Sequence, residues 1–521
     1  MPDTDPSAKP RSPREPFPLE AIGLVAGPVL AAIAFALLPV QYAGADGGVV
    51  DFPPAGRAAL AMMVWMAVWW LTEAVPIAAT ALLPIAAFPL LGIAPLREAT
   101  APYASDVIFL FLGGFILAGA IQRWGLDRRI AFLTLRLVGT RPDAVTGGLM
   151  AATAFVSMWV SNTATAAMMV PIALSVIDLV LVRRGGRTLA EHGGIPSEHE
   201  GVRRFAMGLL LCIAYAASIG GIGTLVGSPP NGIAARFITQ TFGREVSFLD
   251  WMVLGLPVVL VFLPLGWWLV TRVLFASGLG EIEGGREWVA RELRALGPLG
   301  RGERLTLVVF AVTVALWITR PLLADLVVAG AKPFAALSDS GIAITAALAL
   351  FVLPGDRGRA RLADWSVARA VPWDVLILFG GGLSLAAAVE ARGVAGYFGS
   401  LAVGFSGLPP LLVLLAVIAL TTFLSELTSN TAQVATMVPL LAAIGPAVGV
   451  SPEVLVVACA LAASAAFMMP VGTPPNAIVF GTGLLTIGQM ARAGFWMNLV
   501  GIAVNTAAAF LLVGPLLARG A

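Results

Sequence analysis

Two short polar motifs interrupt long apolar stretches and have the residue types of an ion-binding site. The tripeptide Ser161-Asn-Thr lies within the stretch 142–182, and Ser429-Asn-Thr lies within 408–447. Ser, Asn and Thr are good helix N-caps, so we expect a helix to begin at each motif. A helix start presents unpaired backbone N–H groups and behaves as roughly half a positive charge. Several such starts together can attract an anion without a buried lysine or arginine.

A second pair of motifs supplies further helix starts and oxygen atoms. Gly227-Ser-Pro-Pro-Asn is matched by Gly472-Thr-Pro-Pro-Asn, and proline suits the first turn of a helix. Helices that end at these glycines and at the two Ser-Asn-Thr motifs leave free carbonyls, and the hydroxyls of Ser157 and Ser425 lie one turn before each tripeptide. Carbonyl, hydroxyl and amide oxygens suit a hard cation such as sodium. The four motifs therefore predict an anion held beside small cations.

The motifs recur at constant offsets in the numbering, which indicates an internal repeat. Asp106-Val-Ile-Phe-Leu-Phe-Leu-Gly-Gly resembles Asp374-Val-Leu-Ile-Leu-Phe-Gly-Gly-Gly, at an offset of 268. The same offset relates the two Ser-Asn-Thr motifs. The offset between the two Pro-Pro-Asn motifs is 245, a difference that the longer loop at 183–203 explains.

The elements that carry these motifs are predicted to be membrane helices. Of 521 residues, 58% are hydrophobic and only 12% are charged, with a mean hydropathy of +0.91, and apolar runs of about 20 residues recur along the chain. We predict about eleven spans, at 21–40, 57–72, 76–93, 106–121, 204–237, 250–275, 303–319, 340–354, 373–391, 453–486 and 494–517. The stretches 142–182 and 408–447 are compatible with two spans or one re-entrant hairpin each. Their short uncharged breaks favour hairpins with polar tips inside the membrane.

The distribution of basic residues predicts the orientation. With a cytoplasmic N-terminus, 24 of the 32 Lys and Arg residues fall in cytoplasmic segments. Five spans separate the two hairpins, so the second enters from the opposite face, as in the inverted-topology repeats of secondary transporters. We interpret residues 1–17 as a disordered cytoplasmic tail, 18–300 as the first span plus the first inverted repeat (hairpin 142–182, broken helix 204–237), and 301–521 as the second inverted repeat (hairpin 408–447, broken helix 453–486).

Four acidic residues near these elements have open or structural interpretations. Glu426 lies three residues before Ser429, and it is either functional or a hairpin residue that faces water or a partner. Glu73, in the sequence Trp69-Trp-Leu-Thr-Glu-Ala-Val-Pro, is interpreted as structural or gating. Asp106 and Asp374 are most simply helix N-caps.

These residues resemble the divalent anion–sodium symporter family. The Trp-Trp-Leu-Thr-Glu-Ala-Val-Pro segment, both Ser-Asn-Thr motifs and both Pro-Pro-Asn motifs occur in order, and the resemblance covers nearly the whole chain after the tail. It implies a homodimer whose transport domain moves like an elevator against a scaffold, and import of dicarboxylates, tricarboxylates or sulfate with sodium.

The resemblance also implies site residues. The substrate would contact Asn162, Thr163, Ser228, Pro229, Asn430, Thr431, Thr473 and Pro474. One sodium ion would lie near Ser157, Ser161, Asn162 and Gly227, and another near Ser425, Ser429, Asn430 and Gly472. Gln433 departs from the Ala-Thr that is common after the second tip, which leaves the substrate's identity open.

The expected function is sodium-coupled import of C4-dicarboxylates such as succinate, malate or fumarate, across the inner (plasma) membrane. A sodium-independent dicarboxylate exchanger, and a sulfate or tricarboxylate symporter, are alternatives within the same fold. An anion channel or a membrane enzyme belongs to a different class; the sequence has no nucleophile–base pair or metal cluster at membrane depth, so we predict no enzymatic activity. No basic cluster interleaved with aromatic residues predicts nucleic-acid binding.

Overall fold

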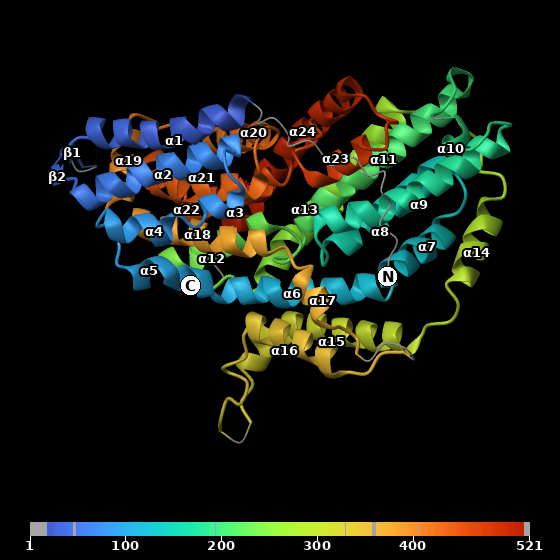
Figure 1. Ribbon diagram of the computed structural model, residues 1–521, viewed down its shortest axis with the longest axis horizontal. Helices are drawn as coiled ribbons and strands as arrows, with labels where there is room; N and C mark the ends of the chain where they lie inside the picture. Colours follow the sequence, from blue (N-terminus) through green and yellow to red (C-terminus); the bar gives the residue numbers. More distant parts are fainter. Residues whose placement is uncertain are drawn as a thin grey trace, which may run out of the picture.

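The computed structural model describes residues 18–44, 48–192, 194–328, 330–356, 361–405 and 407–514, so the predicted tail 1–17 lies outside the described residues. Most of the long helices run along the long axis of the molecule, and the amphipathic helix α14 (Gly285–Ala295) stands across them at one end (Figure 1). Besides helices, the described residues form two short antiparallel strands, β1 (Gln41–Ala43) and β2 (Val49–Asp51).

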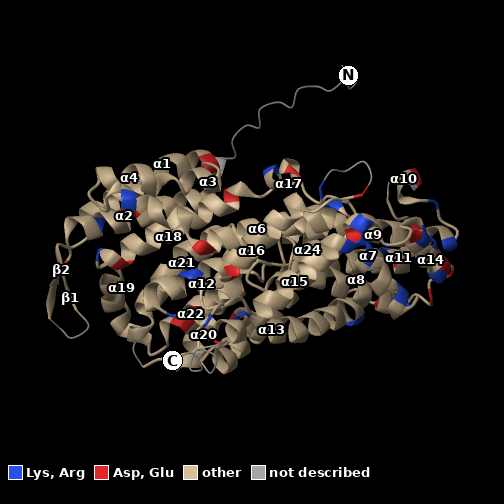
Figure 2. Ribbon diagram, turned by 90° about the horizontal axis from the view of Figure 1, so that it is seen from below, with Lys and Arg blue, Asp and Glu red and all other residues tan. Residues whose placement is uncertain are grey.

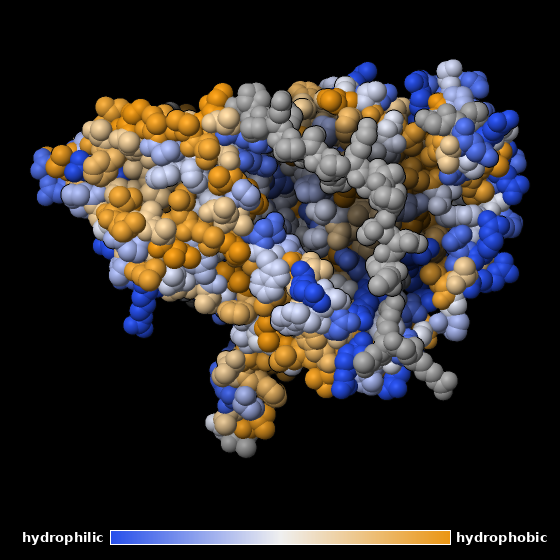
Figure 3. All heavy atoms as spheres, viewed as in Figure 1, coloured by the Kyte–Doolittle hydropathy of each residue, from blue (hydrophilic) through white to orange (hydrophobic). Residues whose placement is uncertain are grey.

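The surface is that of a multi-pass membrane protein. Nine helices in the described part of the chain are long and apolar enough to cross a membrane. Only 17% of the apolar window of α1 (Pro18–Leu37) and 22% of that of α15 (Arg301–Ala324) are buried, so these helices expose apolar side chains that need lipid or another chain. Charged residues gather at the end that carries α14 and α7 (Leu126–Val138), and scattered ones lie over the rest of the molecule (Figure 2). Apolar side chains cover much of the face in Figure 3.

The remaining helices follow the predicted spans closely. In the first half they are α2 (Pro54–Thr72), α3 (Ile77–Thr80), α4 (Leu83–Leu90), α5 (Leu96–Thr100), α6 (Asp106–Arg123), α8 (Pro142–Ser157), α9 (Asn162–Arg183), α10 (Leu189–His192), α11 (Glu200–Gly221), α12 (Pro229–Phe242) and α13 (Phe248–Trp268). In the second half they are α16 (Asp339–Val352), α17 (Trp365–Arg369), α18 (Trp373–Ala391), α19 (Val394–Ala402), α20 (Pro410–Ser425), α21 (Asn430–Ile444), α22 (Pro452–Ala463), α23 (Pro474–Phe480) and α24 (Ile487–Ala508).

Two predicted spans differ from the structure. The span 76–93 is divided into α3 and α4, because a new helix starts just before Pro84, which is at an early helical position where proline is tolerated. The last span begins at Ile487 rather than at 494. Thr486 forms a capping box with Gln489 there, a start signal that hydropathy alone does not contain.

Helix boundaries repeat at the offsets found in the sequence. α8 ends at Ser157 and α9 begins at Asn162; at the same offset that relates the Ser-Asn-Thr motifs, α20 ends at Ser425 and α21 begins at Asn430. Both predicted helical hairpins are therefore present as pairs of helices joined at a Ser-Asn-Thr tip. The predicted broken helices are also present, as α11–α12 and α22–α23.

The hairpins and broken helices of the two halves pack crosswise. α9 of the first hairpin packs against α23, and α21 of the second hairpin packs against α12. Around this centre, α6 approaches α16 closely through Gly113, where an added Cβ would lie 2.5 Å from the carbonyl carbon of Ala343. The missing side chain at this glycine therefore lets α6 and α16 pack closely.

Candidate transport site

The two Ser-Asn-Thr motifs start helices as predicted. Ser161 is the N-cap of α9 and its hydroxyl accepts the Ala164 N–H at 3.4 Å. Ser429 is the N-cap of α21 and accepts the Ala432 N–H at 3.5 Å. The cap leaves other N–H groups of each first turn free for a ligand.

The Pro-Pro-Asn motifs also start helices. α12 follows Ser228 and α23 follows Thr473, and neither side chain makes a capping hydrogen bond. The Ser228 hydroxyl instead lies 3.4 Å from that of Ser464, just after the end of α22. α9 packs on α23 and α21 packs on α12, so the four helices that begin at these motifs belong to one packed group. Neither Ser-Asn-Thr motif has a Lys or Arg within ten residues along the sequence, and the helix starts contribute positive potential at the tips.

In the first half, oxygen atoms form a compact cluster. The Ser157 hydroxyl lies 2.6 Å from the carbonyl oxygen of Ala217 and 2.7 Å from the side-chain oxygen of Asn162. The same end of the Asn162 amide lies 2.9 Å from the Ala217 oxygen and 3.2 Å from the Gly227 oxygen. The structure thus brings together three residues of the first predicted sodium set, whereas the Ser161 hydroxyl is used as a helix cap.

This cluster fits a hard cation. When the side-chain oxygen of Asn162 points into the cluster, four oxygens lie together with only one hydroxyl proton among them. A cation can bind such a set of oxygens. Without an ion, hydrogen bonding favours the orientation in which the amide nitrogen donates to Ser157, Ala217 and Gly227.

In the second half, the corresponding hydroxyl has a different partner. Ser425 donates to Gln433 Oε1 at 2.7 Å and also lies 2.8 Å from the Thr421 carbonyl oxygen. The Gln433 amide nitrogen donates to the same Thr421 oxygen at 2.9 Å, which ties α21 to α20. Asn430 Oδ1 is buried and has no hydrogen-bond partner among the described residues. The structure therefore does not bring Ser425 and Asn430 together.

The sequence prediction did not include two asparagines that hold the broken helices. Asn231 donates to the carbonyl oxygens of Gly221 and Thr224, at 2.9 and 2.7 Å. Asn476, its counterpart in the second half, donates to the carbonyls of Ala466 and Met469, at 3.3 and 3.0 Å. Both are the last residue of a Pro-Pro-Asn motif, so the motif itself was the signal. Each amide binds the free carbonyls of the interruption and fixes its shape.

Glu426 faces neither water nor a partner protein. It is 4% exposed, and its carboxylate accepts the backbone N–H groups of Phe467, Met468 and Met469 at 2.7–3.0 Å and the side-chain amide of Asn498 at 2.7 Å. These N–H groups belong to the interruption between α22 and α23. The carboxylate thus stabilises the second break from within the protein.

Several residues predicted to contact the substrate have polar groups without a partner or surfaces that are exposed. The Thr473 hydroxyl, like Asn430 Oδ1, is buried without a hydrogen-bond partner among the described residues. Thr163 and Pro474 are exposed, and Thr431 and Pro229 are partly exposed. Buried polar atoms without partners are costly unless a ligand or water binds them.

Two cavities lie at positions that the repeat relates. The Ser161 cavity, of about 580 Å³, is lined by the end of α6, by α17 and by the first tip, including Val160, Ser161 and Ala164. The Arg236 cavity, of about 610 Å³, is lined by the end of α18 and by the segment after Ala94. Six of its lining residues are the counterparts, at the offset of 268, of residues in the Ser161 cavity, namely Glu98, Ala99, Pro102, Ala104, Ala387 and Ala391.

The two cavities differ in whether a hairpin tip lines them. No counterpart of Val160, Ser161 or Ala164 appears among the described residues that line the Arg236 cavity. Arg236 and Gln240 of α12 are there instead, and Arg236 forms an ion pair with Asp106 at 3.0 Å. Asp106 is the first residue of α6 and Ser105 is its N-cap, so the predicted capping role of Asp106 is wrong.

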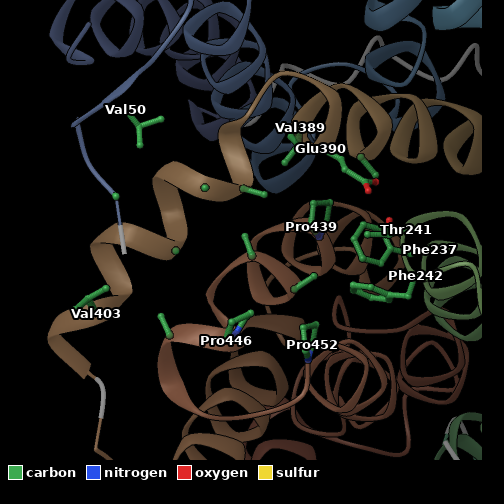
Figure 4. A pocket seen from close by; sticks show the side chains of 18 of the residues that line it. Val50, Phe237, Thr241, Phe242, Val389, Glu390, Val403, Pro439, Pro446 and Pro452 are labelled. Atoms are coloured by element: carbon green, nitrogen blue, oxygen red, sulfur yellow. The ribbon is translucent and has the colours of Figure 1, made fainter. Parts of the chain in front are cut away.

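A third cavity, of about 700 Å³, lies away from the tips (Figure 4). It is bordered by β1, β2, α19 and the ends of α12, α18 and α21. Its only charged residue among the described lining is the acid Glu390, and Phe237 and Phe242 form part of its wall. It therefore does not suit an anion.

Hairpins and broken helices that pack crosswise, with an oxygen cluster at the first tip, are typical of a secondary transporter. The chain belongs to the family described as "Sodium:sulfate symporter transmembrane region", whose model matches residues 30–517. The predicted resemblance to divalent anion–sodium symporters is confirmed, and the family is one of transporters rather than enzymes.

The chain is similar to curated proteins of this family along nearly its whole length. It is 39% identical over 500 residues to the sodium-dependent dicarboxylate transporter SdcS of Staphylococcus saprophyticus, covering 96% of this chain and 92% of that protein. Against SdcS of Staphylococcus aureus the identity is 39% over 490 residues, covering 94% and 90%.

Two solved transporters share the fold. MtrF of Neisseria gonorrhoeae, from a class of antimetabolite efflux pumps, has a TM-score of 0.60 at 15% identity and covers 96% of both chains. The YdaH transporter of Alcanivorax borkumensis has a TM-score of 0.58 at 13% identity, covering 96% of this chain and 98% of that one.

Proposed function

We propose that this protein is a sodium-coupled importer of C4-dicarboxylates such as succinate, malate and fumarate, located in the inner (plasma) membrane. Its relatives in two staphylococci are named sodium-dependent dicarboxylate transporters. The observation that carries the proposal is the group of oxygens from Ser157, Ala217 and Gly227 around Asn162, at the start of a helix that packs crosswise on the second broken helix. Helix starts attract an anion, and the cluster suits a small cation.

The substrate carboxylates bind at the tips of the two hairpins in this proposal. Each carboxylate accepts N–H groups from a first helical turn and hydrogen bonds from the polar tip side chains. The proposed substrate contacts are Asn162, Thr163, Ser228, Pro229, Asn430, Thr431, Thr473 and Pro474. The unpartnered oxygens of Asn430 and Thr473 support the participation of these side chains.

Sodium is the co-transported ion in this proposal. In the first half, Ser157, Asn162 and Gly227 supply its oxygens, and Ala217 adds a fourth that the sequence prediction did not include. A cation there offsets the charge of the neighbouring dicarboxylate, so each favours binding of the other. The second predicted set, with Ser425, Ser429, Asn430 and Gly472, stays a prediction.

Alternating access is proposed to use the repeat. The two halves have opposite orientations in this proposal, with the N-terminus in the cytoplasm, and the Ser161 cavity opens on the cytoplasmic side. Access of the first tip to this cavity, and the presence of α12 rather than the second tip at the Arg236 cavity, support an inward-facing state. An elevator movement of the hairpins and broken helices would exchange the two arrangements.

A homodimer embedded in the lipid bilayer is also proposed. Much of α1 and α15 is unburied within one chain although both helices are strongly apolar. Lipid and a second copy of the chain would cover these faces.

The proposal is tested by succinate uptake into proteoliposomes with and without an inward sodium gradient. We expect the gradient to drive accumulation, and unlabelled malate and fumarate to compete with succinate. Uptake that ignores the gradient would point to exchange. Competition by sulfate or citrate that exceeds competition by malate would overturn the assignment to C4-dicarboxylates. Currents far above any turnover-limited flux would indicate a channel.

A further inference from the structure

Two substitutions between the repeats fall at the sodium position itself. At the offset of 268, Thr165 of the first hairpin is replaced by Gln433 in the second. At the offset of 245, Gly221 at the end of α11 is replaced by Ala466. The second equivalence is also structural, because Asn231 and Asn476 donate to the carbonyls of Gly221 and Ala466, respectively.

The first substitution redirects a hydroxyl. Ser157 Oγ lies 2.6 Å from the Ala217 carbonyl, so it joins the first hairpin to α11. Ser425 Oγ bonds only within its own hairpin, to the Gln433 side chain and the Thr421 carbonyl. The counterpart of the Ala217 carbonyl, that of Ala462, lies 3.5 Å from the hydroxyl of Thr422 instead. Ser425 is thus held inside the hairpin, away from α22.

Gln433 is fully satisfied in this position. Its Oε1 accepts from Ser425 at 2.7 Å and from Thr428 at 3.3 Å, its Nε2 donates to Thr421 at 2.9 Å, and the residue is only 1% exposed. The Thr165 hydroxyl, by contrast, is buried and makes no hydrogen bond among the described residues. A buried amide with both ends paired resists displacement by an ion, because its partners would lose their hydrogen bonds.

The second substitution removes the room for an asparagine side chain. A Cβ built on Gly221 would lie 2.6 Å from Asn162 Oδ1, so the Asn162 amide reaches the cluster only because residue 221 is glycine. Ala466 carries this methyl group at the equivalent place. Consistently, the Asn162 amide bonds the Ser157 hydroxyl in either orientation, whereas Asn430 Oδ1 has no partner among the described residues.

Glu426 does not act as a sodium ligand in place of Ser425 and Asn430. Although its Oε2 would lie 3.1 Å from a Cβ on Gly472, the carboxylate already accepts from three backbone N–H groups and from the Asn498 amide. An ionised carboxylate has about four acceptor positions, and five donor contacts fill them.

We propose that Gln433 and Ala466 close the sodium position of the second half, so that substrate binding is coupled to sodium through the first half. The inference rests on the proposed sodium-coupled transport. If both half-sites bound sodium in the same way, one more sodium ion would be coupled to substrate binding than we infer for this chain. Gln433 acts as a fixed, neutral substitute for an ion in the second hairpin.

The test measures sodium ions taken up on substrate binding. Calorimetric titration of the purified full-length protein with succinate, at several sodium concentrations with choline as replacement, gives the slope of log Kd against log sodium concentration. The double variant Gln433→Thr/Ala466→Gly gives the second half the first-half residues. We expect its slope to be steeper than that of the wild type by about one, as one more linked ion requires.

Two single variants form a matched control pair. Ser157→Ala should flatten the slope by about one, because it removes a ligand of the coupled ion, whereas Ser425→Ala should leave the slope at its wild-type value. This pair tests the inference even where the double variant does not fold, and monodisperse elution identifies folded variants. Equal slopes for the wild type and the folded double variant, or flattening by Ser425→Ala, would overturn the inference while leaving sodium coupling intact. A wild-type slope of zero would overturn both this inference and the proposed sodium coupling.

Discussion

The two half-sites have the same helix starts, but different side chains bond the free backbone groups at their breaks. In the first half, Gly221 allows the Asn162 amide to reach the end of α11, and the Thr224 hydroxyl bonds the Met158 carbonyl and accepts the Gly227 N–H. In the second half, a carboxylate at position 426 binds three consecutive N–H groups of the break. The first break places the oxygens of Ser157, Ala217 and Gly227 around the Asn162 amide, and the second is filled by the Glu426 carboxylate.

This difference shows that a duplicated backbone does not imply a duplicated ion site. The helix starts at the tips and at the Pro-Pro-Asn motifs repeat at the same offsets because caps, prolines and Asn231/Asn476 repeat. Ion binding depends on where single oxygens point, and one methyl group or one longer side chain changes this.

The two tip asparagines should be the most sensitive positions. Asn162→Ala and Asn430→Ala should each abolish measurable succinate uptake, since each removes an amide that we place on a substrate carboxylate, and a hydrogen bond to a charged group corresponds to roughly 10- to 100-fold in affinity. Calorimetry should distinguish the two variants. Asn162→Ala should lose both substrate affinity and the dependence of that affinity on sodium, whereas Asn430→Ala should lose substrate affinity but keep its sodium dependence. Transport at the wild-type rate by either folded variant would discredit the proposed site.

The two motif glycines should differ in their tolerance of a methyl group. A Cβ on Gly227 would lie 2.6 Å from the backbone oxygen of Gly221, which cannot move without opening the break. A Cβ on Gly472 meets the Glu426 side chain at 3.1 Å, which can shift slightly. We expect Gly227→Ala to reduce uptake more than about tenfold, and Gly472→Ala only about two- to threefold. Similar losses in both variants would mean that the breaks are equally rigid.

Sequence alone predicted the helices and breaks well, and the chemistry within the breaks less well. The motifs state where helices start, so Ser161, Ser429 and the Pro-Pro-Asn segments were placed correctly. Gln433 was recognised as unusual, but its fold-back onto Ser425 depends on the distance between α20 and α21, which no local pattern encodes. The contacts of Glu426 similarly join residues 41–43 positions apart and Asn498 at 72. Such pairings appear only when the helices are packed.

The Glu426 carboxylate should contribute mainly to stability. Glu426→Gln keeps the shape of the side chain but replaces one acceptor oxygen with an amide nitrogen, which faces N–H donors in the second break. We expect a melting temperature lower by several degrees and uptake reduced by a few-fold, because charge-assisted hydrogen bonds are each worth about 1.5–3 kcal/mol. Met158, its counterpart in the first half, provides the control: Met158→Leu should leave both quantities near the wild-type values. An unchanged melting temperature for Glu426→Gln would contradict the proposed role of the carboxylate.

The ion pair between Asp106 and Arg236 should have the smallest effect. Both residues line the Arg236 cavity, but the Asp106 side chain is 63% exposed, and exposed ion pairs contribute at most about 1 kcal/mol. Asp106→Asn should therefore shift the balance toward the outward-facing state by no more than about fivefold. Single cysteines at Ala370, in the Ser161 cavity, and Ala387, in the Arg236 cavity, report this shift through their rates of labelling by a hydrophilic thiol reagent. Both alanines are exposed, and the native Cys212 and Cys459 are buried, so the background is low. In the Asp106→Asn background, labelling should become faster at position 387 and slower at 370; equal changes at both positions would mean that the pair loosens the structure without exchanging the two cavities.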